Sequence, residues 1–277
     1  MLALVGGAAA IGFAPIFVRW SEVGLNATAF WRLALAVPAL LVICRVSGPV
    51  VMPKQDRMLL AFAGLCFALD LIFWHASIAL TSVANSTLLA NLTPIVVVLF
   101  YWVVRRERPT GRFALGAGLA LVGAAGLALS SAGIGVRDAP AGDLLGVLTA
   151  FAYAGYLLAV ERARDSTGGF QVLLASTAVA AVITGATGLA LGEHFLPASP
   201  EGWSVLLGLA LLVHVAGQGG IVWALGQLPA SLSSVVILIS PVVAAILGWL
   251  LLDEPLGPAA AASAGLVLAG VLIVRRR

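Results

Sequence analysis

The chain has 277 residues, of which 61% are hydrophobic and only 10% are charged. Soluble globular proteins carry about 25% charged residues, so this composition excludes a soluble domain, and the apolar excess excludes a disordered chain. The net charge of +3 comes from basic residues in several short segments without aromatic neighbours, a pattern that does not indicate nucleic-acid binding.

Ten apolar stretches follow one another, each long enough to cross the roughly 30 Å of hydrocarbon in a bilayer. We expect an all-α membrane protein, because membrane-spanning β-strands show alternating segments of about 10 residues instead. The connections are too short to hold a soluble domain. The predicted spans are residues 2–18, 27–45, 59–79, 84–104, 111–130, 142–160, 170–191, 203–224, 231–252 and 258–274.

The basic residues predict how these spans are oriented. If the N-terminus is cytoplasmic, twelve basic residues lie in cytoplasmic segments, and only Arg19 and Arg137 lie in external loops. Cytoplasmic loops carry such an excess of Lys and Arg, so we expect both termini inside and a multi-pass protein of a bacterial-type inner membrane. The clusters 105–108 and 275–277 are expected to contact membrane lipid headgroups.

An internal repeat divides the chain into two halves. Thr93-Pro94-Ile95-Val96, followed by Trp102 and Glu107, returns 147 residues later as Ser240-Pro241-Val242-Val243, followed by Trp249 and Glu254. Residues 1–132 and 133–277 each hold five spans, an odd number. The halves are therefore predicted to be inverted repeats around a central cavity, the architecture of alternating-access transporters.

These motifs, with Phe30-Trp31-Arg32 at the start of the second span, resemble the drug/metabolite transporter superfamily in its EamA-domain branch. The resemblance covers essentially the whole chain. It implies a central cavity lined mainly by spans 3, 4, 6, 8 and 9. Characterised members that resemble this chain export amino acids such as threonine, methionine and aromatic ones, or small toxic compounds.

Ionisable side chains at mid-depth are the first site candidates, because placing them in hydrocarbon is costly. Asp70 lies at the centre of the third span, and His214 occupies nearly the equivalent position in the eighth, with Gln218 one turn later. An Asp70–His214 contact would satisfy both groups and respond to pH. The alternative is that each residue is hydrogen-bonded separately to a neighbouring helix.

Other polar and aromatic residues extend the predicted site. Pro94 and Pro241 are expected to kink their helices and to leave two backbone carbonyls free for a ligand ammonium group. Arg32 either extends to the membrane surface, pairs with Glu22 or attracts a carboxylate at the outer mouth. The remaining candidates for substrate binding or cavity lining are Trp74, His75, Asn85, Asn91, Tyr153 and Tyr156.

The chain carries no enzyme signature. It lacks a GxxxxGK[ST] loop, an HExxH motif and Cys/His ligand spacing, so we expect no catalysis, no cofactor and no metal. We predict an alternating-access exporter of small metabolites, foremost amino acids, that is a monomer or a weak homodimer. The alternatives are an exporter of drugs or cationic toxic compounds, a membrane-embedded enzyme and a passive pore.

Overall fold

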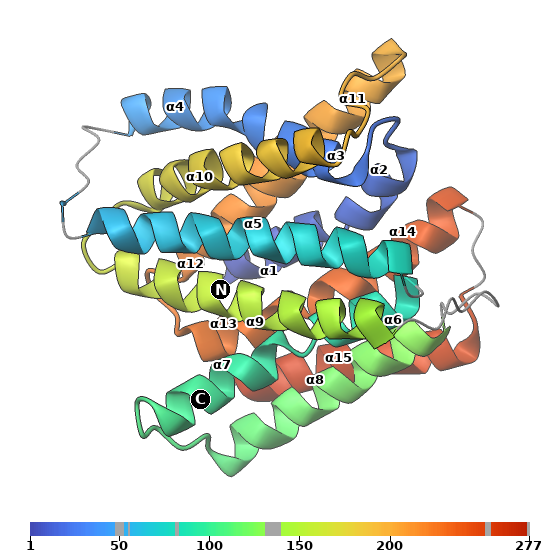
Figure 1. The fold of residues 1–277 in the computed structure, drawn as a ribbon. Coiled ribbons are helices and arrows are strands. Elements are labelled where there is room, and N and C mark those ends of the chain that lie inside the picture. The colour runs from blue at the N-terminus through green and yellow to red at the C-terminus, as the bar shows by residue number, and fades with distance from the viewer. Residues whose placement is uncertain (48–52, 55, 81–82, 131–139, 253–255, 276–277) are drawn as a thin grey trace.

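The computed structural model describes residues 1–47, 53–54, 56–80, 83–130, 140–252 and 256–275, with the backbone alone at 83–85 and 130. These residues form helices and no strand (Figure 1). The helices are α1 (Leu2–Ile11), α2 (Ala14–Trp20), α3 (Leu25–Ala34), α4 (Ala36–Val46), α5 (Asp56–Leu80), α6 (Val83–Ala90), α7 (Thr93–Val103), α8 (Gly111–Ser130), α9 (Pro140–Ala163), α10 (Gly169–Ala190), α11 (Pro200–Gly208), η1 (Leu209–Gln218), α12 (Gly219–Ala224), α13 (Ala230–Ile237), α14 (Ile239–Leu252) and α15 (Pro258–Arg275).

Ten spans long and apolar enough to cross a membrane are present in the described part of the chain, which confirms the predicted all-α membrane fold. Each coincides with a predicted stretch. Span 1 comprises α1 and α2, span 2 α3 and α4, span 4 α6 and α7, span 8 α11, η1 and α12, and span 9 α13 and α14. The inverted relation between the halves stays a prediction.

Four of these spans are broken, and each break has the same cause. The helix before the break ends at Ile11, Ala34, Ala90 or Ile237, which is four residues before a proline in every case. Proline has no N–H to donate to that carbonyl, and its ring pushes the carbonyl away. The prolines responsible are Pro15, Pro38, Pro94 and Pro241.

Span 8 departs from α-helical geometry in a different way. Its central part, η1, is a π-helix that carries His214 and Gln218. Here α1 packs directly on the backbone of span 8: a Cβ atom at Gly220 would lie 2.6 Å from the carbonyl oxygen of Ala3. The small residues of span 8 therefore allow span 1 to approach closely.

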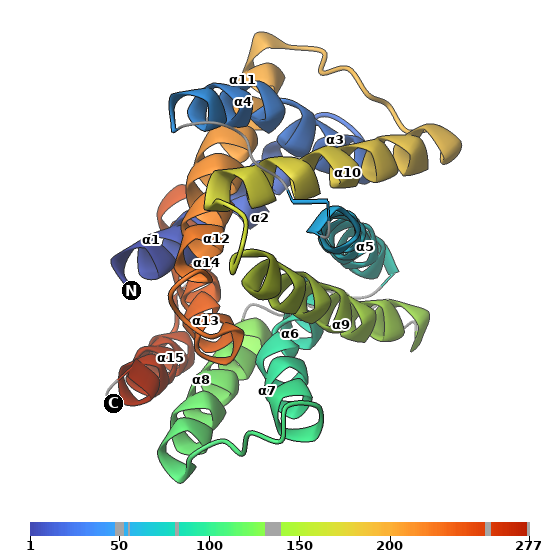
Figure 2. The same ribbon diagram turned by 90° about the vertical axis from the view of Figure 1, so that its left-hand side faces the viewer.

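The helices form a bundle with one peripheral pair. α5 and α9 pack side by side, α10 lies against α5 and α3, and α8 pairs with α15 at one edge of the bundle (Figures 1 and 2). The α8–α15 contact is tight, because a Cβ atom at Gly123 would lie 2.5 Å from the carbonyl oxygen of Ser263. Large apolar side chains such as Val46 and Leu189 stay exposed around the bundle, as expected where lipid is the solvent.

Candidate functional site: a cavity at the helix breaks

A cavity of about 180 Å³ lies between spans 1, 2, 3, 4, 6, 8 and 9. A single water needs only about 10–15 Å³ on this scale, so the cavity has room for a larger molecule. Its lining includes the prolines of three broken spans, Pro15, Pro94 and Pro241. Irregular backbone is tolerated at membrane depth where it lines such a space, so the proline breaks shape the cavity wall.

Two charged side chains of opposite sign line the cavity. Arg32 of α3 is 7% exposed, and its guanidinium carbon lies 5.9 Å from the centre of the Phe67 ring. Asp70 of α5 is partly exposed in the same space, close enough for electrostatic attraction to Arg32. A buried guanidinium requires such compensation, since neither charge is stable alone in hydrocarbon.

The orientation of Arg32 was not recognised from the sequence. Pairing with Glu22, one of the alternatives considered, is not found among the described residues. The Glu22 carboxylate instead accepts hydrogen bonds from the Ser199 hydroxyl and the backbone N–H groups of Ala198 and Ser199, at 2.8 and 3.1 Å for the latter two. Glu22 thus ties the loop after α2 to the start of α11. The Phe30-Trp31-Arg32 motif marks Arg32 in the sequence. It does not indicate that the Arg32 side of α3 faces the cavity.

Five of the predicted site residues lie in the cavity wall. They come from α5, from the break between α6 and α7, from α9 and from η1. Two of their amide nitrogens, Asn91 Nδ2 and Gln218 Nε2, are buried and have no hydrogen-bond partner among the described residues. Such donors are costly to leave unpaired, so they suit contact with a polar molecule in the cavity. The five residues are Asp70, Trp74, Asn91, Tyr153 and Gln218.

Three other candidates pack beside the cavity and are not part of its lining. His214 is fully buried, and its Nε2 lies 2.7 Å from the Thr177 hydroxyl oxygen. Tyr156 is also fully buried, and its hydroxyl has no hydrogen-bond partner in the described residues. His75 is 2% exposed and packs against Trp74, with 5.2 Å between ring centres.

Phe67 separates His214 and Tyr156 from the cavity. Its ring centre lies 5.5 Å from that of His214 and 4.8 Å from that of Tyr156, while Phe67 itself lines the cavity. In the described part of the chain, no hydrogen bond or ion pair joins Asp70 to His214; Thr177 is the partner of the histidine instead. Phe67 precedes Asp70 by one turn on α5. This spacing in the sequence indicates that Phe67 shares the cavity-facing side of the helix with Asp70.

The helix breaks differ in detail from the prediction. The carbonyl of Ala90, expected to be free, accepts a hydrogen bond from the Thr93 hydroxyl at 2.9 Å. A threonine one residue before the proline can reach back to the carbonyl that the proline leaves unpaired, so this oxygen is already occupied. Asn85 belongs to α6, but its side chain lies outside the described residues.

Within the described residues, no group of three or more His, Cys, Asp or Glu side chains is arranged to hold a metal ion. Cys44 and Cys66 are separate, buried thiols in α4 and α5. The arrangement provides binding groups of both charges and aromatic surface around one cavity. It supports recognition of a small molecule with both polar and apolar parts.

Comparison with known proteins identifies a family and a similar fold. The sequence model of the EamA-like transporter family matches residues 1–129 and residues 140–276. A solved structure titled "Crystal structure of protein" superposes with a TM-score of 0.84 at 17% identity, over 99% of this chain and 96% of its own length. At that identity the likeness shows the fold alone. No curated protein matches this chain at comparable significance.

Proposed function

The chain belongs to the EamA-like transporter family, and from this premise we propose that it exports small metabolites, foremost amino acids, from the cytoplasm by alternating access. The cavity is the proposed substrate site. In this proposal the two halves are inverted repeats that rock against each other around the cavity, with both termini in the cytoplasm.

One observation carries the choice of substrate: the cavity is lined by one guanidinium and one carboxylate. A free amino acid is a zwitterion with the complementary pair. Its carboxylate would bind Arg32, whose planar guanidinium suits bidentate contacts, and its ammonium group would bind Asp70. Asn91 and Gln218 add hydrogen-bonding groups to the same site.

The aromatic part of the wall is suited to the substrate side chain. Phe67, Trp74 and Tyr153 line the cavity, and Tyr153 stacks on Tyr156 with ring centres 5.9 Å apart. Such surfaces favour apolar and aromatic side chains. The proposal therefore favours amino acids with apolar side chains over acidic ones, which would bring a second negative charge beside Asp70.

A second candidate, export of a cationic drug or toxic compound, is favoured by Asp70 together with Trp74 and Tyr153. A carboxylate and aromatic faces attract an organic cation. Arg32 opposes it, because a buried positive charge repels the ligand. The two candidates therefore differ in what Arg32 does: it attracts an amino acid and repels a cation.

The test is counterflow in proteoliposomes with labelled amino acids and labelled organic cations. For an amino-acid exporter, Arg32→Gln should lower counterflow of the best amino acid by about tenfold or more, since a charge-assisted contact is lost. For a cation exporter, the same substitution should preserve or raise counterflow of the cation. Lack of counterflow for every compound in a folded protein, or single-channel conductance in a planar bilayer, would contradict the proposal.

A further inference from the structure

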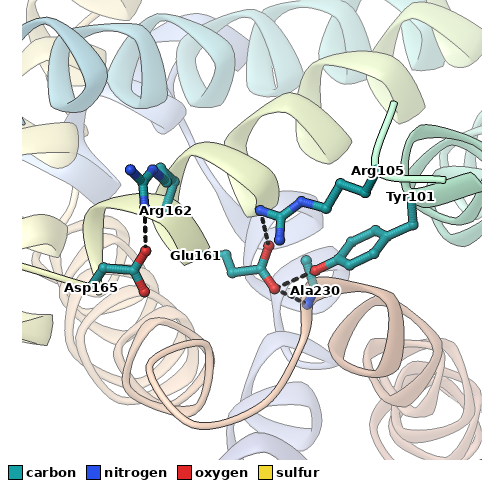
Figure 3. A network of polar contacts seen from close by, with 6 residues as sticks. All are labelled: Tyr101, Arg105, Glu161, Arg162, Asp165 and Ala230. Atoms are coloured by element: carbon teal, nitrogen blue, oxygen red, sulfur yellow. Dashed lines mark hydrogen bonds and ion pairs between the residues drawn. The ribbon is translucent and has the colours of Figure 1, made fainter. Parts of the chain in front are cut away.

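Away from the cavity, one carboxylate joins three helices. Glu161 of α9 accepts hydrogen bonds at Oε1 from the Tyr101 hydroxyl of α7 and from the backbone N–H of Ala230, the first residue of α13, the latter at 2.9 Å (Figure 3). Its Oε2 lies 3.7 Å from a guanidinium nitrogen of Arg105. We call Glu161, Tyr101, Arg105 and Ala230 the Glu161 network.

Three members of the Glu161 network are largely buried, whereas the Arg105 side chain is 42% exposed. Tyr101 is 8% exposed, Ala230 is fully buried, and the side chain of Glu161 is 15% exposed. The nearby pair Arg162–Asp165 differs: both side chains are about two-thirds exposed, at 67% and 65%, and they lie three residues apart in the chain. Buried charge-assisted bonds between helices are stronger than an exposed local pair, so only the network is expected to hold helices together.

The three helices that meet at Glu161 also line the cavity. Pro94 of α7 lies seven residues before Tyr101, Tyr153 lies eight before Glu161, and Ser234 lies four after Ala230. At 1.5 Å per residue, the network is roughly 6–12 Å from the cavity wall along every helix. On all three helices, the direction from the cavity to the network points to the end of the bundle that the basic residues assign to the cytoplasm.

Along α7 and α9, buried apolar residues lie between the level of the cavity and the level of the network. Val97 of α7 and Leu157 and Val160 of α9 lie between the two levels and are fully buried. A substrate passing from the cytoplasmic end would have to displace these side chains. Separation of α7 from α9 and α13 opens that path, and it requires the hydrogen bonds to Glu161 to break.

On α14, small residues occupy the positions that repeat Val97 and Tyr101 of α7. At the offset of 147 residues that relates spans 4 and 9, Val97 corresponds to Ala244 and Tyr101 to Gly248. Ala244 lines the cavity, whereas Val97 is fully buried. Beyond Pro241 the cavity therefore extends along α14 away from the Glu161 network, whereas the equivalent level of α7 is closed.

We propose that the Glu161 network is an inner gate, which closes the cytoplasmic end of the cavity and stabilises the outward-facing state. This rests on the proposed alternating-access function. The hydrogen bonds to Glu161 form only while the cytoplasmic end is closed, so they favour that state. Loss of the network shifts the population toward the inward-facing state.

The test measures access to the cavity without any substrate. Ser240→Cys, in a Cys44→Ala/Cys66→Ala parent, places one thiol in the cavity wall, where Ser240 is partly exposed. A membrane-impermeant thiol reagent is added to right-side-out and to inside-out vesicles. The parent should react faster from outside. Glu161→Ala should raise the rate from the cytoplasmic side roughly tenfold and lower the external rate, because two hydrogen bonds to a charged group are lost.

Two further variants make the test decisive. Tyr101→Phe removes a single hydroxyl and should shift both labelling rates in the same directions by a smaller factor. This variant replaces Glu161→Ala in the test if Glu161→Ala does not fold. Asp165→Asn removes the exposed pair beside the network and should leave both rates at the parent value. Unchanged rates in folded Glu161→Ala and Tyr101→Phe, or a faster external rate, would overturn the inner gate. Shifted rates without counterflow of any substrate would contradict the proposed function alone.

Discussion

Arg32 of α3 and Asp70 of α5 bring opposite charges to the wall of one cavity. Each is the electrostatic partner of the other, since the remaining lining residues that the structure describes are uncharged. The pair therefore has two roles in our account. It makes a buried arginine tolerable in the membrane, and it provides the two charges that a zwitterionic substrate complements.

The stability of single and double variants tests the first role. Removing one partner of a buried pair leaves an uncompensated charge and typically costs about 3–5 kcal/mol, less where water reaches the site as at Asp70. Arg32→Gln and Asp70→Asn should each lower the melting temperature in detergent. The double variant should lose less than the sum of the two, because no charge is left unpaired. Additive losses would show that the residues do not interact.

The sequence predicted the spans well, because apolar runs and proline positions act locally. Ten stretches and the kinks at Pro94 and Pro241 follow from bilayer thickness and from the missing proline N–H. Polar residues at mid-depth, such as Asp70 and Gln218, also identified part of the cavity wall. These inferences need no knowledge of which helices are neighbours.

The remainder depended on tertiary packing. Equivalent positions in the repeat suggested that Asp70 and His214 meet, but the Phe67 ring lies against His214, and Thr177 provides the histidine's partner. The π-helical geometry of η1 also changes which side chains share a face, and nothing in the local sequence indicated it. The inward direction of Arg32 depends on how α3 is rotated against α5, which only the assembled bundle determines.

The orientation in the membrane is tested by labelling. Glu107 follows α7, Leu196 lies between α10 and α11, and both are exposed. In the parent without native cysteines, Leu196→Cys should react with an impermeant maleimide on intact cells, whereas Glu107→Cys should react only after permeabilisation, because the basic residues place residue 107 inside. Labelling of Glu107→Cys on intact cells would reverse the topology and place the Glu161 network at the outer end.

The Glu22 contact predicts a pH-dependent contribution to stability. The Ser199 hydroxyl, together with two backbone N–H groups, lowers the pKa of the Glu22 carboxyl. A group whose native pKa is lowered stabilises the fold above its ordinary value, about 4.3 for glutamate, and loses that effect as the pH falls through the native value. Glu22→Gln should therefore melt below the wild type at pH 7, and the difference should vanish in acid. A constant difference across this range would exclude the linkage.

Protonation of Asp70 is the next point to test. A neutral carboxyl would leave the Arg32 charge uncompensated and would remove the proposed ammonium partner, so transport should depend on pH through this residue. Asp70→Asn should flatten the pH profile of counterflow in a folded protein. His214→Gln should preserve the profile, since Phe67 separates His214 from the cavity. If both variants keep the wild-type profile, Asp70 is structural and transport is facilitated diffusion.

The four proline breaks provide a matched experiment on the cavity. Pro94 and Pro241 line the cavity, whereas Pro38, which breaks span 2 in the same way, does not. Pro94→Ala and Pro241→Ala restore an N–H four residues after the broken carbonyl, so both should straighten their helices. Straightening changes the shape of the cavity wall and should lower counterflow while the melting temperature is kept or raised.

Pro38→Ala is the control, because it restores the same backbone hydrogen bond at a break that does not line the cavity. It should keep wild-type counterflow and gain similar thermal stability. At Pro94, the Ala90 carbonyl already accepts a hydrogen bond from the Thr93 hydroxyl. Combining Thr93→Val with Pro94→Ala removes this bond, so the carbonyl is free for the restored N–H and the loss of counterflow should be larger. Equal loss of counterflow in Pro38→Ala and Pro241→Ala would mean that helix flexibility in general, and not the shape of the cavity wall, limits transport.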